Sequence, residues 1–377
     1  MYEQQNAINK DWHLERYFIT EEYANKLSGF KVEGGDIIVS CAGTIGETYE
    51  IPMDAEPGII NQALMKIKVK ESIVNKKMFN ILFTNMIDDF TRVHSNGSAI
   101  KNIPPFSDLK PMEVFVPEMD EQNKISFYFS NLDHLITLHQ RKCEQTKNLK
   151  KYMLQKMFPQ NGAKVPEIRF DGFTYDWEQR KLGEILISLQ NNTLSRADLS
   201  NKIGFAKNVH YGDVLIKFGE VLDVSREQLP MITDEKILDK YKASFLQNGD
   251  VIIADTAEDT TVGKCSEIAG LSDEVVLSGL HTIPYRPVEK FATGYLGYYL
   301  NSVAYHNQLI PLMQGIKVTS ISKSAMQDTD IVYPKSKEEQ AMIGSYFQSI
   351  DHLITLHQRK CDELKKMKKY MLQNMFI

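Results

Sequence analysis

The chain has few cysteines, no strong excess of one charge and no long apolar run. Its four cysteines lie far apart in 377 residues without CxxC spacing, which argues against a disulfide framework and predicts buried, reduced thiols. No apolar run approaches the roughly 18 residues of a membrane span, and the polar N-terminus lacks the apolar core of a signal peptide. We therefore expect a soluble, cytoplasmic protein.

Sequence patterns typical of catalysis are also missing. There is no Gly-rich phosphate loop. Residues 102–106 resemble the Asn-Pro-Pro-Phe motif of amino-methyltransferases, but the inserted Ile103 spoils its geometry and no GxG loop for a methyl donor accompanies it. Asp255, Glu258 and Asp259 near Lys264 would suit a nuclease, although loop carboxylates of this kind are usually solvated or capping. A nuclease or a methyltransferase is therefore not expected.

Histidines occur twice in the same arrangement, as His134 with His139 and as His352 with His357. Their spacing of five residues does not place two zinc ligands on one helical face, as a spacing of four would. We expect structural roles for them, and neither a metal nor a cofactor in the protein.

One stretch of the sequence is present twice. Residues 133–143 and 351–361 are identical, and 22 of 33 positions agree between 127–159 and 345–377. Both copies have helix-forming composition, and their seam positions recur in steps of three and four, as in a coiled coil. These positions are Phe129, Leu132, Ile136, His139, Cys143, Thr146, Lys150, Met153 and Met157, and then Phe347, Ile350, Ile354, His357, Cys361, Leu364, Lys368, Met371 and Met375. We predict two long helices, 127–157 and 345–375, packed antiparallel.

Each repeated helix follows a segment with the same order of features. A Gly-Asp turn at Asp36 or Asp250 leads into a buried strand, and a helical stretch, a Gly loop and a last strand come next. The expected elements are helices at 21–27 and 78–93 and strands after Asp36, at 63–69 and at 114–116 in the first segment, and a strand after Asp250, a helix at 291–309 and a strand at 331–334 in the second. This order predicts an α+β fold with pseudo-two-fold duplication.

The predicted division is 1–118 for a first domain, 119–158 for the first long helix, 159–168 for a linker, 169–335 for a second domain and 336–377 for the second long helix. The two domains begin differently. Trp177 lies 73 residues before Asp250, whereas only 35 residues precede Asp36. We therefore expect the first domain to be incomplete at its N-terminus, with an exposed edge or apolar patch.

These features resemble the specificity subunit of type I DNA restriction-modification systems. The resemblance is carried along the whole chain by residues in a duplicated order, namely Gly35-Asp36 and Gly249-Asp250, Pro117 with Glu121-Gln122, Pro334 with Glu339-Gln340, Asp133 and Asp351, and Trp177 with Lys181-Leu182. It implies two target-recognition domains separated by antiparallel coiled-coil helices. Each domain would read one half of a split target in double-stranded DNA, and the subunit itself would catalyse nothing. Two modification (methyltransferase) subunits and two restriction (endonuclease and translocase) subunits would be its partners.

Net charge is −5, but the two repeated helices together carry +7 and the rest of the chain −12. The lysines of the helices could follow a phosphate backbone, or they could equally form a solvated face. Reading base edges needs polar side chains on loops or helix ends. The candidates are Asn61, Gln62, Ser95, Asn96 and Lys101 in the first domain, and His210, Tyr211, Lys217, Thr256, Gln314, Lys317 and Thr319 in the second. The alternative is a coiled-coil scaffold without DNA specificity, which would explain the seams and the negative charge but not two divergent domains of one architecture.

Overall fold

The computed structural model describes residues 1–14, 16–94, 102–160 and 162–375. The chain forms two units, residues 1–140 with 358–377, and residues 141–357. Two long helices contribute to both units.

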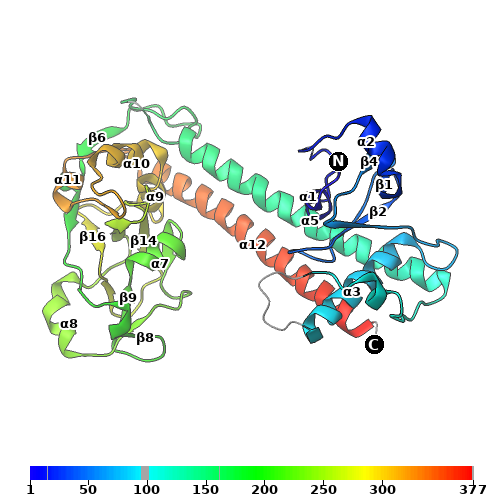
Figure 1. Cartoon of the computed structure of the whole chain (residues 1–377). Coiled ribbons are helices and arrows are strands. Elements are labelled where there is room, and N and C mark those ends of the chain that lie inside the picture. The colour runs from blue at the N-terminus through cyan, green and yellow to red at the C-terminus, as the bar shows by residue number, and fades with distance from the viewer. Residues whose placement is uncertain (15, 95–101, 161, 376–377) are drawn as a thin grey trace. The chain divides into compact units, whose positions relative to one another are not determined.

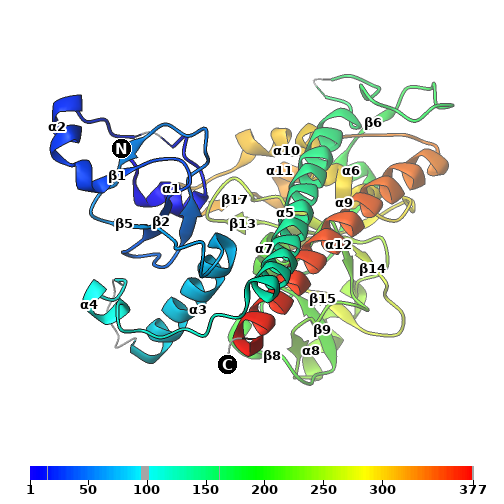
Figure 2. The same cartoon turned by 90° about the vertical axis from the view of Figure 1, so that its right-hand side faces the viewer.

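The two longest helices are α5 (Met119–Lys156) and α12 (Lys337–Met375). They lie side by side in opposite directions (Figures 1 and 2). In the first unit, Asp133 of α5 pairs with Lys368 near the end of α12. In the second unit, Lys150 near the end of α5 pairs with Asp351 early in α12. The prediction of two antiparallel helices is confirmed, and both helices begin earlier than predicted.

The predicted seam is the face along which these helices pack. Phe129, Leu132 and Ile136 of α5 form one buried cluster with Cys361 and Leu364 of α12 in the first unit. In the second unit, Phe347 and Ile350 are buried in the main core with Met157. Burial of the seam explains why two charged helices stay together, since apolar area removed from water contributes about 25 cal/mol per Å².

The first unit is built on a small antiparallel sheet in the order β3-β2-β5 (Thr48–Glu50, Ile37–Ser40, Leu64–Ile67). Helix α3 (Lys76–His94) packs on one side of it through Phe83 and Ile87. The remaining elements are α1 (Gln4–Asn9), α2 (Glu21–Lys26), η1 (Ser28–Phe30), α4 (Phe106–Leu109) and the strand pair β1 and β4 (Lys31–Val32, Gly58–Ile59).

The second unit has a sheet in the order β10-β14-β12-β16-β7 (Val221–Asp223, Cys265–Ala269, Val251–Ala254, Thr282–Pro287, Leu186–Ser188). A second sheet has the order β15-β9-β11-β8 (Val276–Ser278, Ala206–Val209, Met231–Ile232, Leu199–Ser200). Two further pairs are β13 with β17 (Thr256–Ala257, Thr319–Ser320) and β6 with β18 (Glu178–Lys181, Asp330–Tyr333). The helices are α6 (Leu182–Ile185), η2 (Arg196–Asp198), α7 (Tyr211–Ile216), α8 (Lys236–Tyr241), η3 (Lys242–Ser244), α9 (Tyr295–Leu300), α10 (Val303–Leu309), η4 (Ile310–Leu312) and α11 (Lys323–Gln327).

The Gly-Asp motif closes the same turn in both units. Gly35 and Gly249 have φ values of 88° and 92°, a left-handed conformation that costs little only for glycine. The following aspartate then accepts a hydrogen bond from the backbone N–H three residues earlier, at 3.0 Å for Asp36 and 2.8 Å for Asp250. The motif therefore sets where the central strand of each sheet begins.

In each unit, a glutamine near the start of a long helix forms hydrogen bonds with the rest of that unit. Gln122 accepts a hydrogen bond from the backbone N–H of Asn75 at 2.9 Å and donates one to the carbonyl oxygen of Pro117 at 2.9 Å. Gln340 makes the same pair of bonds to Ala292 and Pro334, at 3.0 and 2.8 Å. Pro117 and Pro334 are therefore structural counterparts, as the sequence motif predicted.

Two predicted elements are wrong. Residues 114–116 do not form a strand, because no described strand lies beside them, whereas their counterpart β18 pairs with β6. The single helix predicted over 291–309 is two helices, α9 and α10. The side chain of Asn301 donates to the carbonyl oxygens of Gly297 and Cys265, at 2.7 and 2.9 Å, which ends α9 against the sheet. The five-segment division of the chain stays a prediction.

Candidate nucleic-acid interface

The candidate interface in the second unit lies where the central strand β12 ends. The backbone N–H of Asp255 donates to the carbonyl oxygen of His281 at 3.1 Å, and the carbonyl oxygen of Asp255 accepts from the N–H of Ile321 at 2.9 Å. Thr256 is paired with Ser320 across β13 and β17. Three chain segments distant in sequence are thus brought together at one edge of the sheet.

His281 projects from this edge in a strained conformation. Its φ is 56°, and a left-handed backbone costs a residue other than glycine about 1 to 2 kcal/mol. Its imidazole Nδ1 lies 3.5 Å from a carboxylate oxygen of Asp255 and 3.5 Å from the hydroxyl of Thr256, and its side chain is 47% exposed. Strain of this kind concentrates at functional sites, so His281 belongs among the candidate reading residues.

His210 lies beside this group, at the start of α7. Its Nδ1 accepts a hydrogen bond from the backbone N–H of Gly212 at 3.2 Å, which leaves Nε2 to carry the proton in the neutral ring. Burial lowers the pKa of His210, and the charge of Arg196 lowers it further. His210 is therefore neutral at pH 7 and offers one N–H donor through Nε2.

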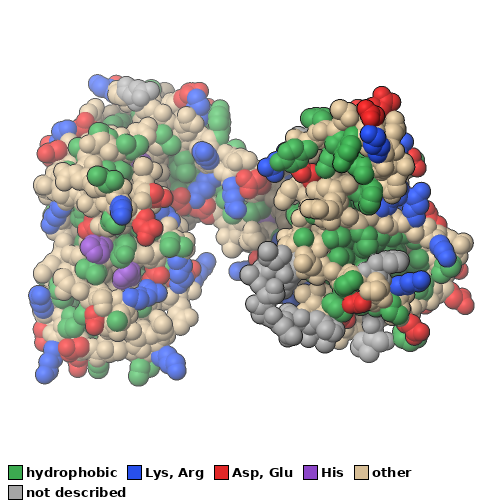
Figure 3. Space-filling view, in the orientation of Figure 1, with side chains coloured by type: hydrophobic (Ala, Val, Ile, Leu, Met, Phe, Trp, Pro, Cys, Tyr) green, Lys and Arg blue, Asp and Glu red, His purple; other side chains and the backbone are tan. Residues whose placement is uncertain are grey.

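Tyr211 connects the two histidines. Its ring centroid lies 4.7 Å from that of His210 and 5.2 Å from that of His281, in an edge-to-face arrangement with the latter. Arg196 also lies near the start of α7, where its guanidinium contacts the carboxylate of Asp213 at 2.5 Å. Figure 3 shows histidine side chains exposed together with Lys and Arg side chains on one face of this unit.

Of the residues predicted in the second domain, the structure brings together His210, Tyr211, Thr256, Gln314 and Thr319. The last two belong here because Gln314 exchanges backbone hydrogen bonds with Ser320, at 2.9 and 2.8 Å, and Thr319 lies opposite Ala257. Lys317 is exposed in the loop that Gln314 and Ser320 close.

Lys217 does not belong to this group. It follows the last residue of α7, at the end opposite His210. Its ammonium donates to the carbonyl oxygen of Gln228 at 2.9 Å and lies 3.3 Å from the carboxylate of Glu227. These contacts give it a local structural role.

His281 and Arg196 were missed by the sequence analysis. The first unit has the same backbone bond, because the N–H of Cys41 donates to the carbonyl oxygen of Ala63 at 2.8 Å. Ala63 directly follows the predicted Asn61 and Gln62, so His281 occupies the corresponding place in the second unit, a correspondence that only the structure shows. Nothing in the sequence near Arg196 indicates its position beside α7.

In the first unit, Gln62 is exposed at this equivalent edge. Asn61 has a structural task, because its side-chain oxygen accepts from the backbone N–H of Ala63 at 3.1 Å. The other three predicted residues, Ser95, Asn96 and Lys101, lie outside the described residues.

The carboxylates near Lys264 make local contacts, and the described residues do not assemble a metal site. They contain no group of three His, Cys, Asp or Glu side chains placed to hold an ion. Asp259 accepts from the backbone N–H of Thr261 at 2.9 Å, which is a turn contact. The Lys264 ammonium donates to the carbonyl oxygen of Leu215 at 2.8 Å, and burial lowers its pKa. No helix among the described residues is long and apolar enough to cross a membrane.

Comparison with known proteins gives consistent matches. Residues 3–148 and 175–366 match the model of the type I restriction modification DNA specificity domain. The MjaVIII specificity subunit of a type I restriction enzyme from Methanocaldococcus jannaschii is 24% identical over 326 residues, which are 84% of this chain and 72% of that protein.

Two solved structures share the fold. One comes from a study of complex assembly and conformational transition in a type I system, with a TM-score of 0.57, 17% identity and coverage of 92% of this chain and 82% of the other. The second is the type I S subunit from M. genitalium, with a TM-score of 0.55, 14% identity and coverage of 92% and 84%.

Proposed function

Because the chain belongs to the type I restriction-modification DNA specificity family, whose specificity subunits are not catalytic, we propose that its two units read the two halves of a split target in double-stranded DNA. The long helices α5 and α12 set the unread gap between the halves. They also provide the docking surface for the methyltransferase subunits.

The observation that carries this proposal is that the two units repeat the same pair of backbone hydrogen bonds after the central strand, while the side chains there differ. We call this pair of bonds the backbone frame. In the first unit the N–H of Cys41 donates to the carbonyl oxygen of Ala63 at 2.8 Å, and the carbonyl oxygen of Cys41 accepts from the N–H of Ile103 at 2.8 Å. Asp255 makes the corresponding bonds to His281 and Ile321, at 3.1 and 2.9 Å. A scaffold that is repeated while its exposed chemistry differs suits two domains that read two different sequences.

The side chains of the second unit supply the donors and acceptors that base reading needs. His210 offers a neutral N–H donor, and Thr256 and Thr319 offer hydroxyl groups. Arg196 is 53% exposed, and an arginine is the side chain best suited to the two acceptors on the edge of guanine. Such direct contacts distinguish bases, whereas contacts to phosphate only position the protein.

The rest of the assembly follows from the proposed role. Exposed lysines on the long helices suit a phosphate backbone or acidic partner surfaces, namely Lys147, Lys151, Lys365, Lys366 and Lys369. Two modification subunits and two restriction subunits complete the complex, and the methyl groups are transferred to adenines in the target.

Mapping methylated adenines in the genome that encodes this chain tests the proposal. The expected result is one motif of two short specified sequences separated by a gap of fixed length, which disappears when this chain is deleted. Methylation that is unaffected by the deletion, or that follows one continuous motif, would contradict it.

A further inference from the structure

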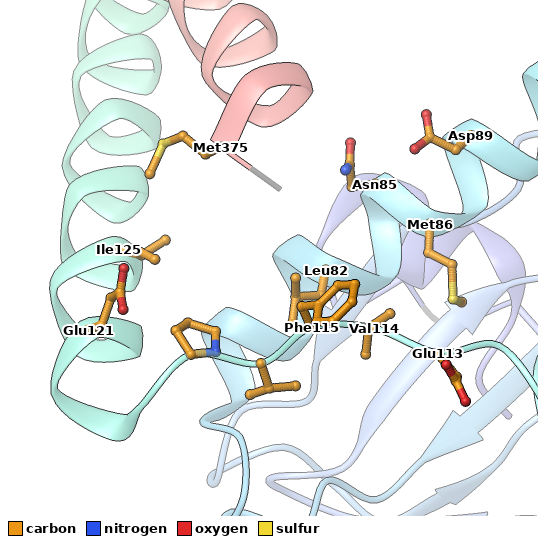
Figure 4. Close-up of a pocket in the computed structure, with 12 residues that line it drawn as sticks. Leu82, Asn85, Met86, Asp89, Glu113, Val114, Phe115, Glu121, Ile125 and Met375 are labelled. Carbon is orange, nitrogen blue, oxygen red and sulfur yellow. The ribbon is translucent and has the colours of Figure 1, made fainter. Parts of the chain in front are cut away.

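The first unit has an uncovered groove beside the start of α5. The groove has a volume of about 410 Å³, and Figure 4 shows side chains from α3, from residues 113–117, from α5 and from the end of α12 facing it. Its apolar residues are exposed, with Phe115 at 92%, Val114 at 45% and Met375 at 40%. Apolar surface gathered in this way marks an interaction site.

The second unit shows what covers the same place there. Ile331 and Val332 are the counterparts of Val114 and Phe115, because both stretches run to the proline that binds the helix glutamine. In the second unit this stretch pairs along its length with β6. Ile331 is then fully buried, as are Leu182 and Trp177 of the covering segment.

Glu121 gives the groove a specific chemistry. Its counterpart Glu339 accepts hydrogen bonds from Arg169 at 2.7 and 2.9 Å, and from the indole N–H of Trp177 at 3.2 Å. Glu339 is 2% exposed at its side chain, whereas Glu121 is exposed.

A second acidic residue lies on the stretch of residues 113–117. Asp330 at the start of β18 is bridged by Lys181 of β6, at 2.8 Å. Glu113 occupies the same place in the first unit and is exposed in the groove lining. The groove therefore combines a backbone stretch that pairs with no strand among the described residues, exposed apolar side chains and two carboxylates.

We propose that this groove is a docking site for an extended segment of a second protein. The segment adds a strand beside residues 113–116, places a tryptophan and an arginine on Glu121, and places a lysine on Glu113. Strand addition of this kind gains affinity from backbone hydrogen bonds and specificity from side-chain pockets. The inference concerns assembly, so it does not rest on DNA reading.

A second copy of this chain does not fit the role. Its own Trp177 is 2% exposed and belongs to the core of the second unit, so donating that segment would open the second unit.

The probe for the test is a labelled synthetic peptide with the sequence of residues 164–188, which contains Arg169, Trp177 and Lys181. Fluorescence anisotropy with the full chain should show saturable binding. Phe115→Asp and Glu121→Gln should each weaken binding at least tenfold, because each removes a proposed contact with the peptide. Both side chains are exposed, so neither substitution should disturb the core. Phe127→Asp is the matched control, because Phe127 is 69% exposed and does not line the groove. It should leave binding unchanged.

Three results would overturn the proposal. The first is no binding at peptide concentrations up to about 1 mM, or binding that Phe115→Asp and Glu121→Gln leave intact. The second is a dimer of the chain alone, in light scattering, that Phe115→Asp dissociates, because a second copy would then be the occupant. The third is an intact mass above 43.2 kDa for the chain from its native host, with the extra residues supplying the strand in the same polypeptide. Peptide binding with a monomeric chain of the expected mass supports it.

Discussion

Lys150 at the end of α5 lies 2.6 Å from a carboxylate oxygen of Asp351 on α12, and also 2.7 Å from Glu220. The repeat forms the same bond a second time, since Lys368 lies 2.6 Å from Asp133. The two bonds differ in exposure, because the side chain of Lys150 is 14% exposed and that of Lys368 is 31% exposed.

Lys150→Ala should destabilise the protein by about 3 to 5 kcal/mol, because it leaves two carboxylates in a largely buried place without their cation. Lys368→Ala is the control within the same chain, and its more exposed pair should contribute less than about 1 kcal/mol. Urea midpoints of the two variants give the comparison. Equal losses would mean that the burial of Lys150 does not govern the stability of the helix pair.

The seam of the long helices should not tolerate a charge. Ile354→Asp places a carboxylate in the core packed around Phe347, which should cost several kcal/mol. Leu353 is the preceding residue and is 45% exposed, so Leu353→Asp should change stability little. Thermal melting of both variants tests this prediction. A melting temperature of Ile354→Asp equal to that of the wild type would show that Ile354 does not lie on a buried seam.

Glu267 should make stability depend on pH. Burial raises its pKa to about 7, although the backbone N–H groups of Gly294, Gly297 and Leu296 lower it. Between about pH 4.5 and pH 7 the folded chain then binds more protons than the unfolded chain, so stability falls as pH rises and is constant above that range. The total fall is roughly 3 kcal/mol at most.

Replacing Glu267 by glutamine removes the titrating group. Unfolding by urea at several pH values should therefore give a flatter profile for Glu267→Gln than for the wild type. A wild-type profile that rises through the same range, or one that the substitution leaves unchanged, would show that Glu267 does not titrate there.

Lys317 should contribute to DNA binding from its exposed loop. If it reads a base, Lys317→Ala should cost about 1 to 3 kcal/mol and relax the second half-site, whereas a phosphate contact would weaken all sequences equally and reduce the salt dependence. Lys217→Ala is the matched control, because that ammonium is bound to Gln228, and it should leave binding unchanged. Wild-type affinity and salt slope for Lys317→Ala would remove this residue from the interface.

Much of the fold could be predicted because its signals are local or repeated. The seam shows which face of each helix is buried, and two identical seams in one chain indicate that the helices pack together. The predicted strand at 114–116 fails for a nonlocal reason. Val114 and Phe115 have strand-forming side chains, but a strand also needs a partner, and its counterpart finds one in β6.

The interface was harder to predict than the fold. Thr256 was proposed because it follows the Gly-Asp strand, and the DNA-binding role of the predicted residues stays a prediction. Arg196 was missed, since its place beside α7 depends on a contact with Asp213 that sequence spacing does not reveal. Lys217 was chosen for its charge, although its local contacts with Gln228 and Glu227 occupy it.

Lengthening both long helices should lengthen the unread gap in the DNA target. Four residues inserted after His139 in α5 and four after His357 in α12 add about 6 Å to each helix at 1.5 Å per residue. That length is close to two base pairs at about 3.4 Å each. Selection of bound sites from random DNA should return the same half-sites with a longer gap, and an unchanged gap with intact binding would exclude the helices as the spacer.

The central claim is that each unit reads its own half of the target. The direct measurement is selection of bound DNA from a random pool by the complex of this chain with its modification subunits, comparing wild type with a variant that carries Arg196→Ala and His281→Ala. Both replaced side chains are about half exposed, at 53% and 47%, so the fold should persist. The account predicts two half-sites at a fixed gap for the wild type, and a variant that relaxes one half-site while keeping the other half-site and the gap. Equal relaxation of both halves, or a wild type that selects no sequence, would contradict it.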